Sequence, residues 1–359
     1  LGSVTRRMHN KSFTVDNHVT IVGGRNIGNE YFDADPTLEF SDLDVMAIGN
    51  VVKEVSKSFD LDWNSELAYP ASTLISDQPT EDEIKLLYEK LQAYIAENKD
   101  SPYLTALRES DLANMVRQKK VVYQWGDAAV VYDLPEKISS DRDATELHLM
   151  TQLAPYFKAV EKELIIFSPY FVPGKEGVEF FKSLTDRGVR VRILTNSLAS
   201  NDVSVVHAGY AKYRKGLLRA GVELYEMNKK LTRTQRKEKK GVSGSSKASL
   251  HAKSFVLDRD KVFIGSLNLD PRSFYENSEI GVVITSAETA ATMAEEFEQT
   301  IEKGAFRLEL VTDEDDNEFI LWHGNENGEP VTFEHDPYTS IWRRMGVGFM
   351  RIMPIESQL

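Results

Sequence analysis

The sequence predicts an α/β protein made of two fused halves, with mixed β-sheets flanked by helices. The first observation is a polar skeleton that occurs twice, as His9-x-Lys11-x4-Asp16-x6-Gly23-Gly24-x-Asn26 and as His251-x-Lys253-x4-Asp258-x6-Gly265-Ser266-x-Asn268. His251 follows His9 by 242 positions, and every other shared position keeps that offset. The second observation is an alternation of strand-like and helix-like patterns between residues 120 and 285. A duplication that preserves polar residues, while the apolar residues between them vary, indicates chemistry more than packing.

Each copy of the skeleton predicts a β-hairpin. In the first copy, β-prone runs at 12–15 and 18–22 flank a turn at Asp16, and runs at 254–257 and 262–264 flank Asp258 in the second. Residues two apart in a strand share a face, so each motif histidine and its lysine point the same way. Asp16 and Asp258 fall in the turns, and we interpret them as turn and ion-pair residues rather than acids acting on substrate.

The remaining elements follow in order along the chain. The apolar patterns predict a strand at 42–49, helices at 51–63 and 81–98, a strand at 120–132, a helix at 144–162, a strand at 164–168, a helix at 176–186 and a strand at 189–195. Thr80 and Glu83 have the spacing of a capping box for the second helix. We expect a first half at 1–63, a mostly helical connector at 64–120, a second half at 121–310 and a tail at 311–359.

The beginning of the chain differs between the two halves. Motif 2 follows a full set of strands and helices, whereas motif 1 starts at His9. By the symmetry of the repeat, an equivalent first half needs roughly a hundred residues ahead of His9. We therefore expect a missing segment that a separate N-terminal piece of the same protein supplies, or a motif-1 hairpin with an exposed edge. In either arrangement His9 and His251 should face each other across one site.

The repeated residue types suit phosphoryl transfer. Lysine and asparagine carry donors for the non-bridging oxygens of a phosphoryl group, and one histidine can attack phosphorus while the other protonates the leaving oxygen. The candidate catalytic residues from the motifs are His9, Lys11, Asn26, His251, Lys253 and Asn268.

A nucleophilic imidazole also needs an acceptor at its second nitrogen. An acidic residue opens an apolar strand after each motif, at Asp42 and at Glu279. We expect these two carboxylates to hold the histidines, with Asp42 behind His9. Asp44 shares the strand face of Asp42 and is the competing candidate.

The twin motifs resemble those of the phospholipase D superfamily. Residues 23–32, 168–174 and 268–273 are similar to bacterial cardiolipin synthases, and most to the class C type, which lacks N-terminal membrane helices. The resemblance covers most of residues 4–359. It implies two fused phospholipase D-like half-domains with a pseudo-two-fold active site at their interface.

The resemblance also implies residue roles. His9 would form a phosphohistidine, and His251 would act as general acid and then as general base. The motif lysines and asparagines would hold the phosphoryl oxygens. Gly24 and Ser266 occupy the same slot in the two copies, so their phosphate contacts need not be symmetric. Two further residues are candidates for substrate binding, namely Tyr170, in a loop after a buried strand, and His207, for which a structural role is the alternative.

The implied activity is phosphatidyl transfer to the hydroxyl of phosphatidylglycerol, which makes cardiolipin. Phosphatidylethanolamine is a further candidate substrate. The alternative within the superfamily is a phospholipase D or nuclease-type phosphodiesterase that uses water, and a third interpretation is an inactive binding scaffold.

The composition limits which classes of partner and cofactor we expect. The net charge of −13 disfavours a protein that coats nucleic acid. The chain has no cysteine, its seven histidines lack metal-ligand spacing, and we expect neither a metal nor another cofactor. No run of 18 apolar residues occurs, so we do not expect the chain as given to span a membrane. The resemblance implies a peripheral protein of the bacterial cytoplasm or inner membrane.

Two segments could contact an anionic membrane surface. Residues 229–247 carry eight lysines or arginines against one glutamate, just ahead of motif 2. Residues 338–354 combine apolar and aromatic residues with Arg343, Arg344 and Arg351, a pattern that fits an interfacial membrane helix. A helix that docks on the core is the alternative for the second segment.

Overall fold

The computed structural model describes residues 6–32, 39–75, 78–201, 203–229, 248–326 and 328–351. Residues 230–247, and with them nearly all of the predicted basic segment, lie outside the described residues, as do residues 352–359. No helix in the described part of the chain is long and apolar enough to cross a membrane.

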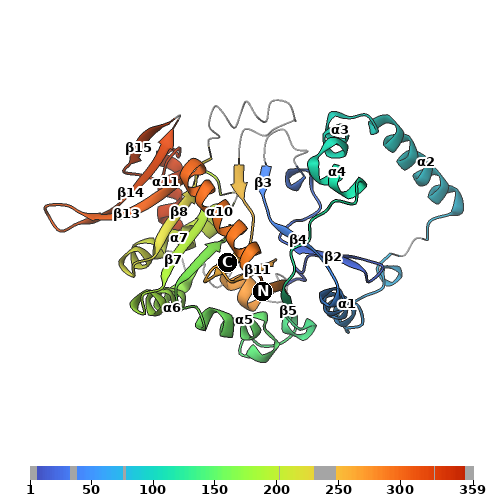
Figure 1. The fold of residues 1–359 in the computed structure, drawn as a ribbon, viewed down its shortest axis with the longest axis horizontal. Helices are drawn as coiled ribbons and strands as arrows, with labels where there is room; N and C mark the ends of the chain where they lie inside the picture. The colour runs from blue at the N-terminus through green and yellow to red at the C-terminus, as the bar shows by residue number, and fades with distance from the viewer. Residues whose placement is uncertain are drawn as a thin grey trace.

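A ten-stranded mixed sheet forms the larger half of the molecule (Figure 1). Its spatial order is β15-β14-β13-β8-β7-β6-β10-β11-β12-β5, with β6, β7 and β8 parallel and the other pairs antiparallel. The strands are β5 (Asp127–Tyr132), β6 (Glu163–Phe167), β7 (Arg190–Asn196), β8 (Glu223–Met227), β10 (Ser254–Leu257), β11 (Lys261–Gly265), β12 (Ile280–Thr285), β13 (Ala305–Thr312), β14 (Glu318–Glu326) and β15 (Glu329–Phe333).

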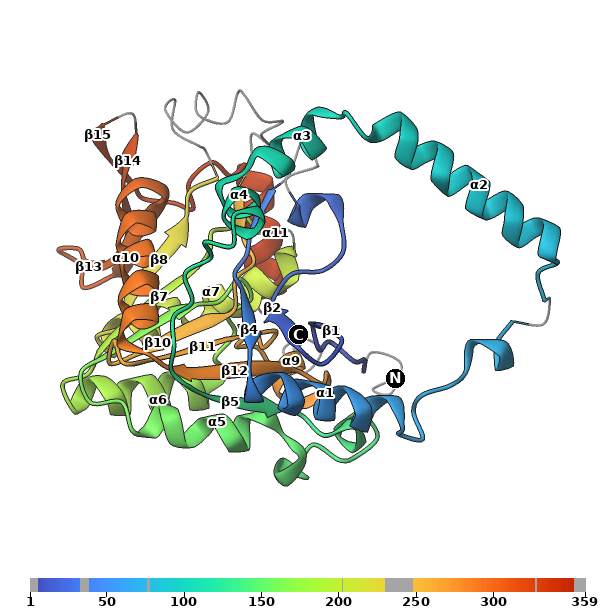
Figure 2. The same cartoon turned by 45° about the vertical axis from the view of Figure 1, so that its right-hand side comes forward.

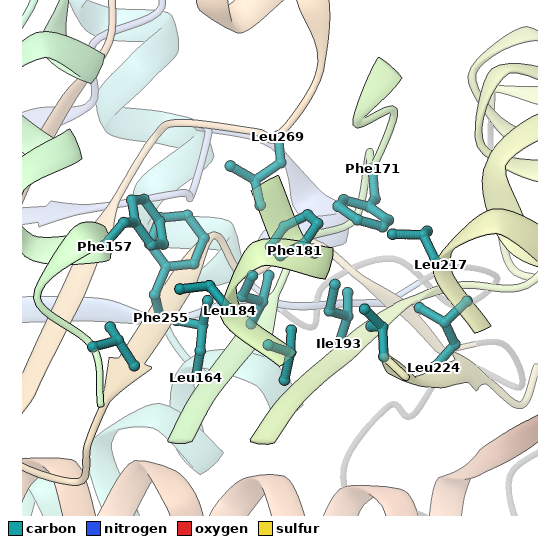
Figure 3. Packing of buried hydrophobic residues seen from close by; sticks show 14 of the residues in the cluster. Phe157, Leu164, Phe171, Phe181, Leu184, Ile193, Leu217, Leu224, Phe255 and Leu269 are labelled. Carbon is teal, nitrogen blue, oxygen red and sulfur yellow. The ribbon is translucent and has the colours of Figure 1, made fainter. Parts of the chain in front are cut away.

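Helices cover both faces of this sheet because its central strands are apolar on both sides. Leu164 and Phe255 join the core under α5 (Leu149–Lys158), α6 (Gly174–Asp186) and α7 (Ser204–Arg219), where Figure 3 shows them beside Phe157 and Phe181. The next residue on each strand, Ile165 or Val256, faces α10 (Ala287–Gly304) instead. This alternation is the two-residue period of a strand, and it confirms the predicted α/β layers.

The first half contains a smaller sheet with the order β1-β2-β4 and one helix. Its elements are β1 (Ser12–Val15), β2 (Val19–Gly23), β4 (Asp44–Ile48) and α1 (Asn50–Trp63). The β1–β2 hairpin matches β10–β11 position for position at the 242-residue offset. The turn residues match too, since Asp16, Asn17, Asp258 and Arg259 all have φ between 51° and 54°. Both predicted hairpins are therefore confirmed.

The outer strands of the two hairpins differ in burial. β10 pairs with β6 on its far side, and Phe255 is buried. β1 is an edge of the three-stranded sheet among the described residues, and Phe13, the counterpart of Phe255, is 66% exposed. The predicted exposed edge beside motif 1 is thus present.

The two halves pack through the returning strands of their hairpins. Val22 of β2, with Val52 and Val55 of α1, contacts Ile280 and Val282 of β12. Two short parallel pairings cross the interface. β3 (Glu39–Ser41) pairs with β9 (Ala248–Leu250), and Met8 bridges to Ser278. Each pairing joins the segment before one motif histidine to the segment before the other half's carboxylate, which is the expected pseudo-two-fold relation.

The connector is helical, as predicted, and consists of α2 (Glu81–Asn98), α3 (Pro102–Glu109) and α4 (Asp111–Arg117). The Thr80–Glu83 capping box is formed. In both views α2 projects away from the two sheets (Figure 1, Figure 2), and none of its side chains is buried. The short helices elsewhere are η1 (Asn29–Tyr31), η2 (Ala71–Thr73), η3 (Pro135–Ile138), η4 (Thr145–Leu147) and α9 (Pro271–Tyr275).

The C-terminal part differs from the expected boundary at residue 310. β13 runs through that position, and β14 and β15 extend the ten-stranded sheet rather than forming a separate tail. The last element, α11 (Ile341–Met350), packs on α7 through Val347.

Candidate active site

The backbone of each motif histidine is held by the opposite half of the molecule. The amide of His9 donates to the carbonyl of Ser278 at 2.9 Å, and the amide of His251 donates to the carbonyl of Ser41 at 2.7 Å. Ser278 and Ser41 each precede a predicted catalytic carboxylate, Glu279 or Asp42. The short parallel pairings therefore bring each histidine beside the carboxylate of the other half.

The side chains complete this crossed arrangement. His9 Nδ1 lies 2.9 Å from both carboxylate oxygens of Glu279, and His251 Nδ1 lies 2.7 Å from Asp42 Oδ2. The expectation that Asp42 lies behind His9 is wrong, because strand pairing across the interface exchanges the two carboxylates. The competing candidate Asp44 contacts neither histidine, since it accepts from Arg25 Nε at 2.6 Å.

The carboxylates fix the tautomer of each imidazole. A hydrogen on Nδ1 donates to the carboxylate, which leaves the lone pair on Nε2 available for phosphorus or for a proton. Burial lowers the pKa of His9, although Glu279 opposes the shift. Burial, together with the charge of Lys253, lowers the pKa of His251 to about 4. Both histidines are therefore neutral near pH 7 in the ligand-free site, as a nucleophile and a general base must be.

The motif lysines turn toward their own histidines. Lys11 Nζ donates to the carbonyl of His9 at 2.9 Å, and Lys253 Nζ donates to the carbonyl of His251 at 2.6 Å. Burial lowers the pKa of Lys11 to about 7, and Lys253 adds to that shift. The charge of Lys11 in turn contributes to the lowered pKa of His251. Charges from both motifs therefore act within one site, which agrees with the single-site prediction.

The glycine and serine of the two motifs support the carboxylates. A Cβ on Gly24 would lie 2.5 Å from Asp42 Oδ1, so the glycine leaves room for that carboxylate. The hydroxyl of Ser266 donates to Glu279 Oε2 at 2.5 Å. The partner of the Ser266 hydroxyl is thus the buried Glu279 carboxylate, and substrate binding by Ser266 stays a prediction. A phosphate contact through Gly24 stays a prediction.

The two motif asparagines have different surroundings. Asn26 Nδ2 donates to the hydroxyl of Tyr31 at 2.7 Å. Asn268 is buried, and its side-chain oxygen has no hydrogen-bond partner among the described residues. An unpaired buried amide oxygen carries a free-energy cost of roughly 1–3 kcal/mol. The two halves are thus related by a pseudo-symmetry that fails at this position.

The two additional substrate-binding candidates, Tyr170 and His207, lie in different environments. The ring of Tyr170 lies edge-on to His251, with 6.5 Å between ring centroids, so its substrate role stays a prediction. His207 is fully buried in α7, and its Nε2 lies 2.7 Å from Arg214 Nη2. Burial lowers the pKa of His207 to about 4, so the neutral ring accepts from the guanidinium. The burial of His207 and its contact with Arg214 favour the structural role, and a substrate contact stays a prediction.

The turn aspartates act as structural residues. The carboxylate of Asp258 accepts from the amides of Glu161, Lys162 and Glu163 at 2.7–2.9 Å. It therefore fixes the start of β6 through backbone donors instead of the expected ion pair. The equivalent Asp16 is exposed at the turn of the first hairpin.

Comparisons with known proteins agree with this geometry. The family model described as "Cardiolipin synthase, PLD-like domain" matches residues 153–301. Cardiolipin synthase C of Escherichia coli K12 is 39% identical over 353 residues, which cover 98% of this chain and 73% of that protein. The chain belongs to the cardiolipin synthase family of phospholipase D-like proteins.

Two further comparisons extend the relationship. An uncharacterised protein of Helicobacter pylori J99 is 30% identical over 98% of this chain and 67% of its own length. The crystal structure of phosphatidylserine synthase from Haemophilus influenzae Rd KW20 superposes with a TM-score of 0.60, at 14% identity, over 99% of this chain and 72% of that chain. That likeness shows the shared phospholipase D-like fold.

Sequence reasoning missed several residues that position the cardiolipin synthase site. Asp133 accepts from the amide of Glu279 at 2.7 Å, and Asn196 makes two hydrogen bonds of 2.9 Å to the backbone of Leu250, next to His251. Both follow or end an apolar strand, which is the signal that could have identified them. Tyr31 gave no such signal, because its contacts to Asn26 and His251 depend on a tertiary fold.

Proposed function

We propose that this chain is a phosphatidyltransferase that moves a phosphatidyl group from one phospholipid to the hydroxyl of phosphatidylglycerol, with cardiolipin as the product. The observation that carries the proposal is the crossed pair of histidine–carboxylate contacts, His9 with Glu279 and His251 with Asp42. It supplies two imidazoles with the same tautomer in one site, as a double displacement at phosphorus requires.

In the first step, His9 Nε2 attacks phosphorus. A P–N bond forms and the P–O bond to the departing alcohol breaks. His251 is neutral in the ligand-free site, so it takes up a proton from solvent when the phosphodiester anion binds beside it, and it gives that proton to the leaving oxygen. The Lys11 and Lys253 ammonium groups, with the Asn26 and Asn268 amides, hold the non-bridging oxygens. The assignment of His9 as nucleophile rests on the resemblance to the family.

In the second step, His251 is neutral and acts as general base. It accepts the proton of the phosphatidylglycerol hydroxyl, whose oxygen attacks phosphorus while the P–N bond breaks and His9 is released. Each turnover therefore returns both histidines to their starting protonation states. With water as the acceptor, the same steps would yield phosphatidic acid.

Lipid analysis tests the proposal. The protein is incubated with isotopically labelled phosphatidylglycerol vesicles, with and without phosphatidylethanolamine, and the products are identified by mass spectrometry. We expect labelled cardiolipin. If its yield depends on added phosphatidylethanolamine, that lipid is the phosphatidyl donor; if not, phosphatidylglycerol is both donor and acceptor. Phosphatidic acid without cardiolipin would instead assign a hydrolase, and the absence of both would support a binding scaffold.

We further propose that the protein works at the surface of the bacterial inner membrane, with an anionic lipid surface as its partner. The support comes from α11, which packs on α7 through Val347 and exposes Ile341, Trp342, Met345 and Phe349. These four residues share one helix face, and Arg343, Arg344 and Arg351 are the only charges in that segment. Because Arg343 also donates to the carbonyl of Asn201, the helix adjoins the loop after β7, which ends at Asn196.

A further inference from the structure

Tyr31 lies beside the proposed acid–base residue, although neither motif includes it. Its side chain is 8% exposed, and its hydroxyl accepts from Asn26 Nδ2 at 2.7 Å and lies 3.4 Å from His251 Nε2. The two rings meet edge to face, with 4.9 Å between centroids and an interplanar angle of 81°. We propose that Tyr31 is a positioning residue that orients Asn26 and His251 and keeps water from His251 Nε2, so that a lipid alcohol is the preferred acceptor. This inference rests on the proposed function of the same site.

A clamp from motif 1 fixes the position of Tyr31. The Arg25 guanidinium donates to the carbonyl of Tyr31 and, through Nε, to Asp44 Oδ2 at 2.6 Å. The amide of Tyr31 donates to the carbonyl of Gly28 at 3.1 Å and closes the short helix η1. Asp44, which holds no histidine, thus acts on the site through Arg25 and Tyr31.

The second half has no equivalent of this tyrosine. The residue 242 positions after Tyr31 is Ser273, whose buried hydroxyl has no hydrogen-bond partner among the described residues. The Asn268 side-chain oxygen is also unpaired. The pseudo-symmetry of the duplication therefore does not require a tyrosine here. Its placement near His251, the residue assigned to handle both alcohols, is what indicates a role in acceptor choice.

The chemistry follows from what surrounds His251. Its Nδ1 is occupied by Asp42, while Lys253 Nζ lies 3.2 Å and the Tyr31 hydroxyl 3.4 Å from Nε2. The Lys11 and Lys253 charges also face the ring. Either acceptor must approach the single lone pair of His251 Nε2, and the Tyr31 hydroxyl, 3.4 Å away, fills space beside it in which a water could rest. A bound lipid alcohol can displace this long contact, whereas a lone water has no such anchoring. Without the Tyr31 hydroxyl, room for about one water opens beside the base. Water would then attack phosphohistidine, the P–N bond would break, a P–O bond would form, and the proton would pass to His251.

Tyr31→Phe tests this inference because it retains the ring and removes only the hydroxyl. Phosphatidic acid and cardiolipin are measured together from phosphatidylglycerol vesicles. We expect the ratio of phosphatidic acid to cardiolipin to rise about threefold to tenfold, as for the loss of one hydrogen-bonding group. Tyr69→Phe makes the same chemical change at a side chain that is 70% exposed, and should leave the ratio unchanged. The ratio does not depend on how much of the variant is folded, so a purely structural role would not change it.

An unchanged ratio in Tyr31→Phe would overturn the inference. If that variant does not fold, Asp44→Asn weakens the Arg25 clamp and keeps the hydroxyl. The ratio should then rise in the same direction, and an unchanged ratio would again count against Tyr31. If the wild-type protein makes no cardiolipin, the proposed function is rejected, but this result does not decide the role of Tyr31. Tyr31 is then tested with a soluble phosphodiester in glycerol–water mixtures, where Tyr31→Phe should lower the ratio of glycerol transfer to hydrolysis, and an unchanged ratio would reject it.

Discussion

At the scale of single residues, each motif histidine contacts a carboxylate, but the two carboxylates differ in their other hydrogen bonds. The carboxylate behind His9 also accepts from the Ser266 hydroxyl, whereas the one behind His251 accepts from the amide of Leu43 at 2.9 Å. Burial would raise the pKa of Asp42, but the contact with His251 and the charge of Lys253 outweigh it and lower that pKa. Asp42 thus stays ionised and can stabilise the imidazolium that His251 forms in each turnover.

The assigned roles predict a covalent adduct on His9. His251→Asn removes the acid of the first step as well as the base of the second, so the substrate is a lipid with a leaving group that needs no proton, such as p-nitrophenolate. The adduct should then form, its breakdown should be slow because no base activates the acceptor, and phosphohistidine should accumulate. His9→Asn should abolish adduct formation. The measurement uses a lipid labelled at its phosphate. Label that stays on the protein and is lost in acid indicates phosphohistidine, and peptide mapping locates it. A label on His251 with none on His9 would reverse the two roles.

The lowered pKa of Lys11 predicts a pH dependence. Its ammonium loses its proton as the pH rises through about 7, which removes a positive charge from the phosphoryl site of the free enzyme. The value of kcat/KM for a soluble phosphodiester reports the free enzyme and should therefore fall above about pH 7. In Lys11→Arg the guanidinium stays charged, so the falling limb should move to higher pH. An active Lys11→Arg variant with an unmoved limb would exclude Lys11 as its source.

The candidate catalytic residues could be selected from their spacing, whereas the pairing of histidines with carboxylates could not. The duplication identified His9, His251 and the residue types around them, because polar positions preserved at one offset carry chemistry. The exchange of Asp42 and Glu279 depends on parallel pairing between β3 and β9, which join residues far apart in the chain. A local sequence pattern does not predict a contact between residues so far apart in the chain. The surroundings of His207 were unpredictable for a related reason, since its neighbours Arg214 and Asp336 come together only in the folded core.

At the scale of elements, the two hairpins provide a matched pair for stability. Asp258 accepts three backbone donors of the β6 start, whereas Asp16 is exposed. Asp258→Ala should lower the free energy of unfolding by roughly 1–2 kcal/mol, because three backbone donors at the start of β6 lose a charged acceptor. Asp16→Ala should change it by less than about 0.5 kcal/mol. Denaturant titration of both variants measures the difference, and equal effects would show that the Asp258 contacts contribute little.

Helix α11 predicts a membrane-binding phenotype. Trp342 is 77% exposed on the apolar face, and inserting a large apolar side chain contributes roughly 1.5–3 kcal/mol. Trp342→Ala should therefore weaken binding to phosphatidylglycerol vesicles by about tenfold or more, as measured by vesicle sedimentation. Trp125→Ala is the control, because Trp125 is 76% exposed outside this helix. Equal losses in both variants would argue against α11 as the contact, and turnover of a soluble substrate should not change in either.

Some helices and strands are shorter than predicted, because side-chain capping and strand pairing set their ends. The helix predicted at 144–162 is shorter, because a turn of 3-10 helix precedes α5 and the Asp133 carboxylate caps its first amide, at Leu149. Pro155 lies within α5, which ends at Lys158. The strand predicted at 120–132 begins only at Asp127, where pairing with β12 starts. Apolar periodicity located these elements, but side-chain capping and strand pairing set their ends.

At the scale of the whole molecule, the proposed mechanism places the phosphoryl charge among lysines and asparagines of both halves. Turnover should therefore persist in EDTA, because two lysines and two asparagines can stabilise the developing charge without a divalent ion. The assay compares rates with and without chelator on vesicles whose dispersion is followed by light scattering. Activity lost in EDTA and restored only by added metal, with vesicles still dispersed, would reveal a metal requirement.

The crossed carboxylates also order events during protein synthesis. When the ribosome has made motif 1, His9 exists, but the glutamate that gives it the reactive tautomer is still 270 residues away. Domains generally fold as they emerge, N-terminal part first. A nascent first half therefore lacks an oriented nucleophile, and the second half lacks an oriented acid until it docks on the first. On the proposed mechanism, an unfinished chain would therefore be unable to cleave membrane lipids, because the site is complete only when the two halves have met.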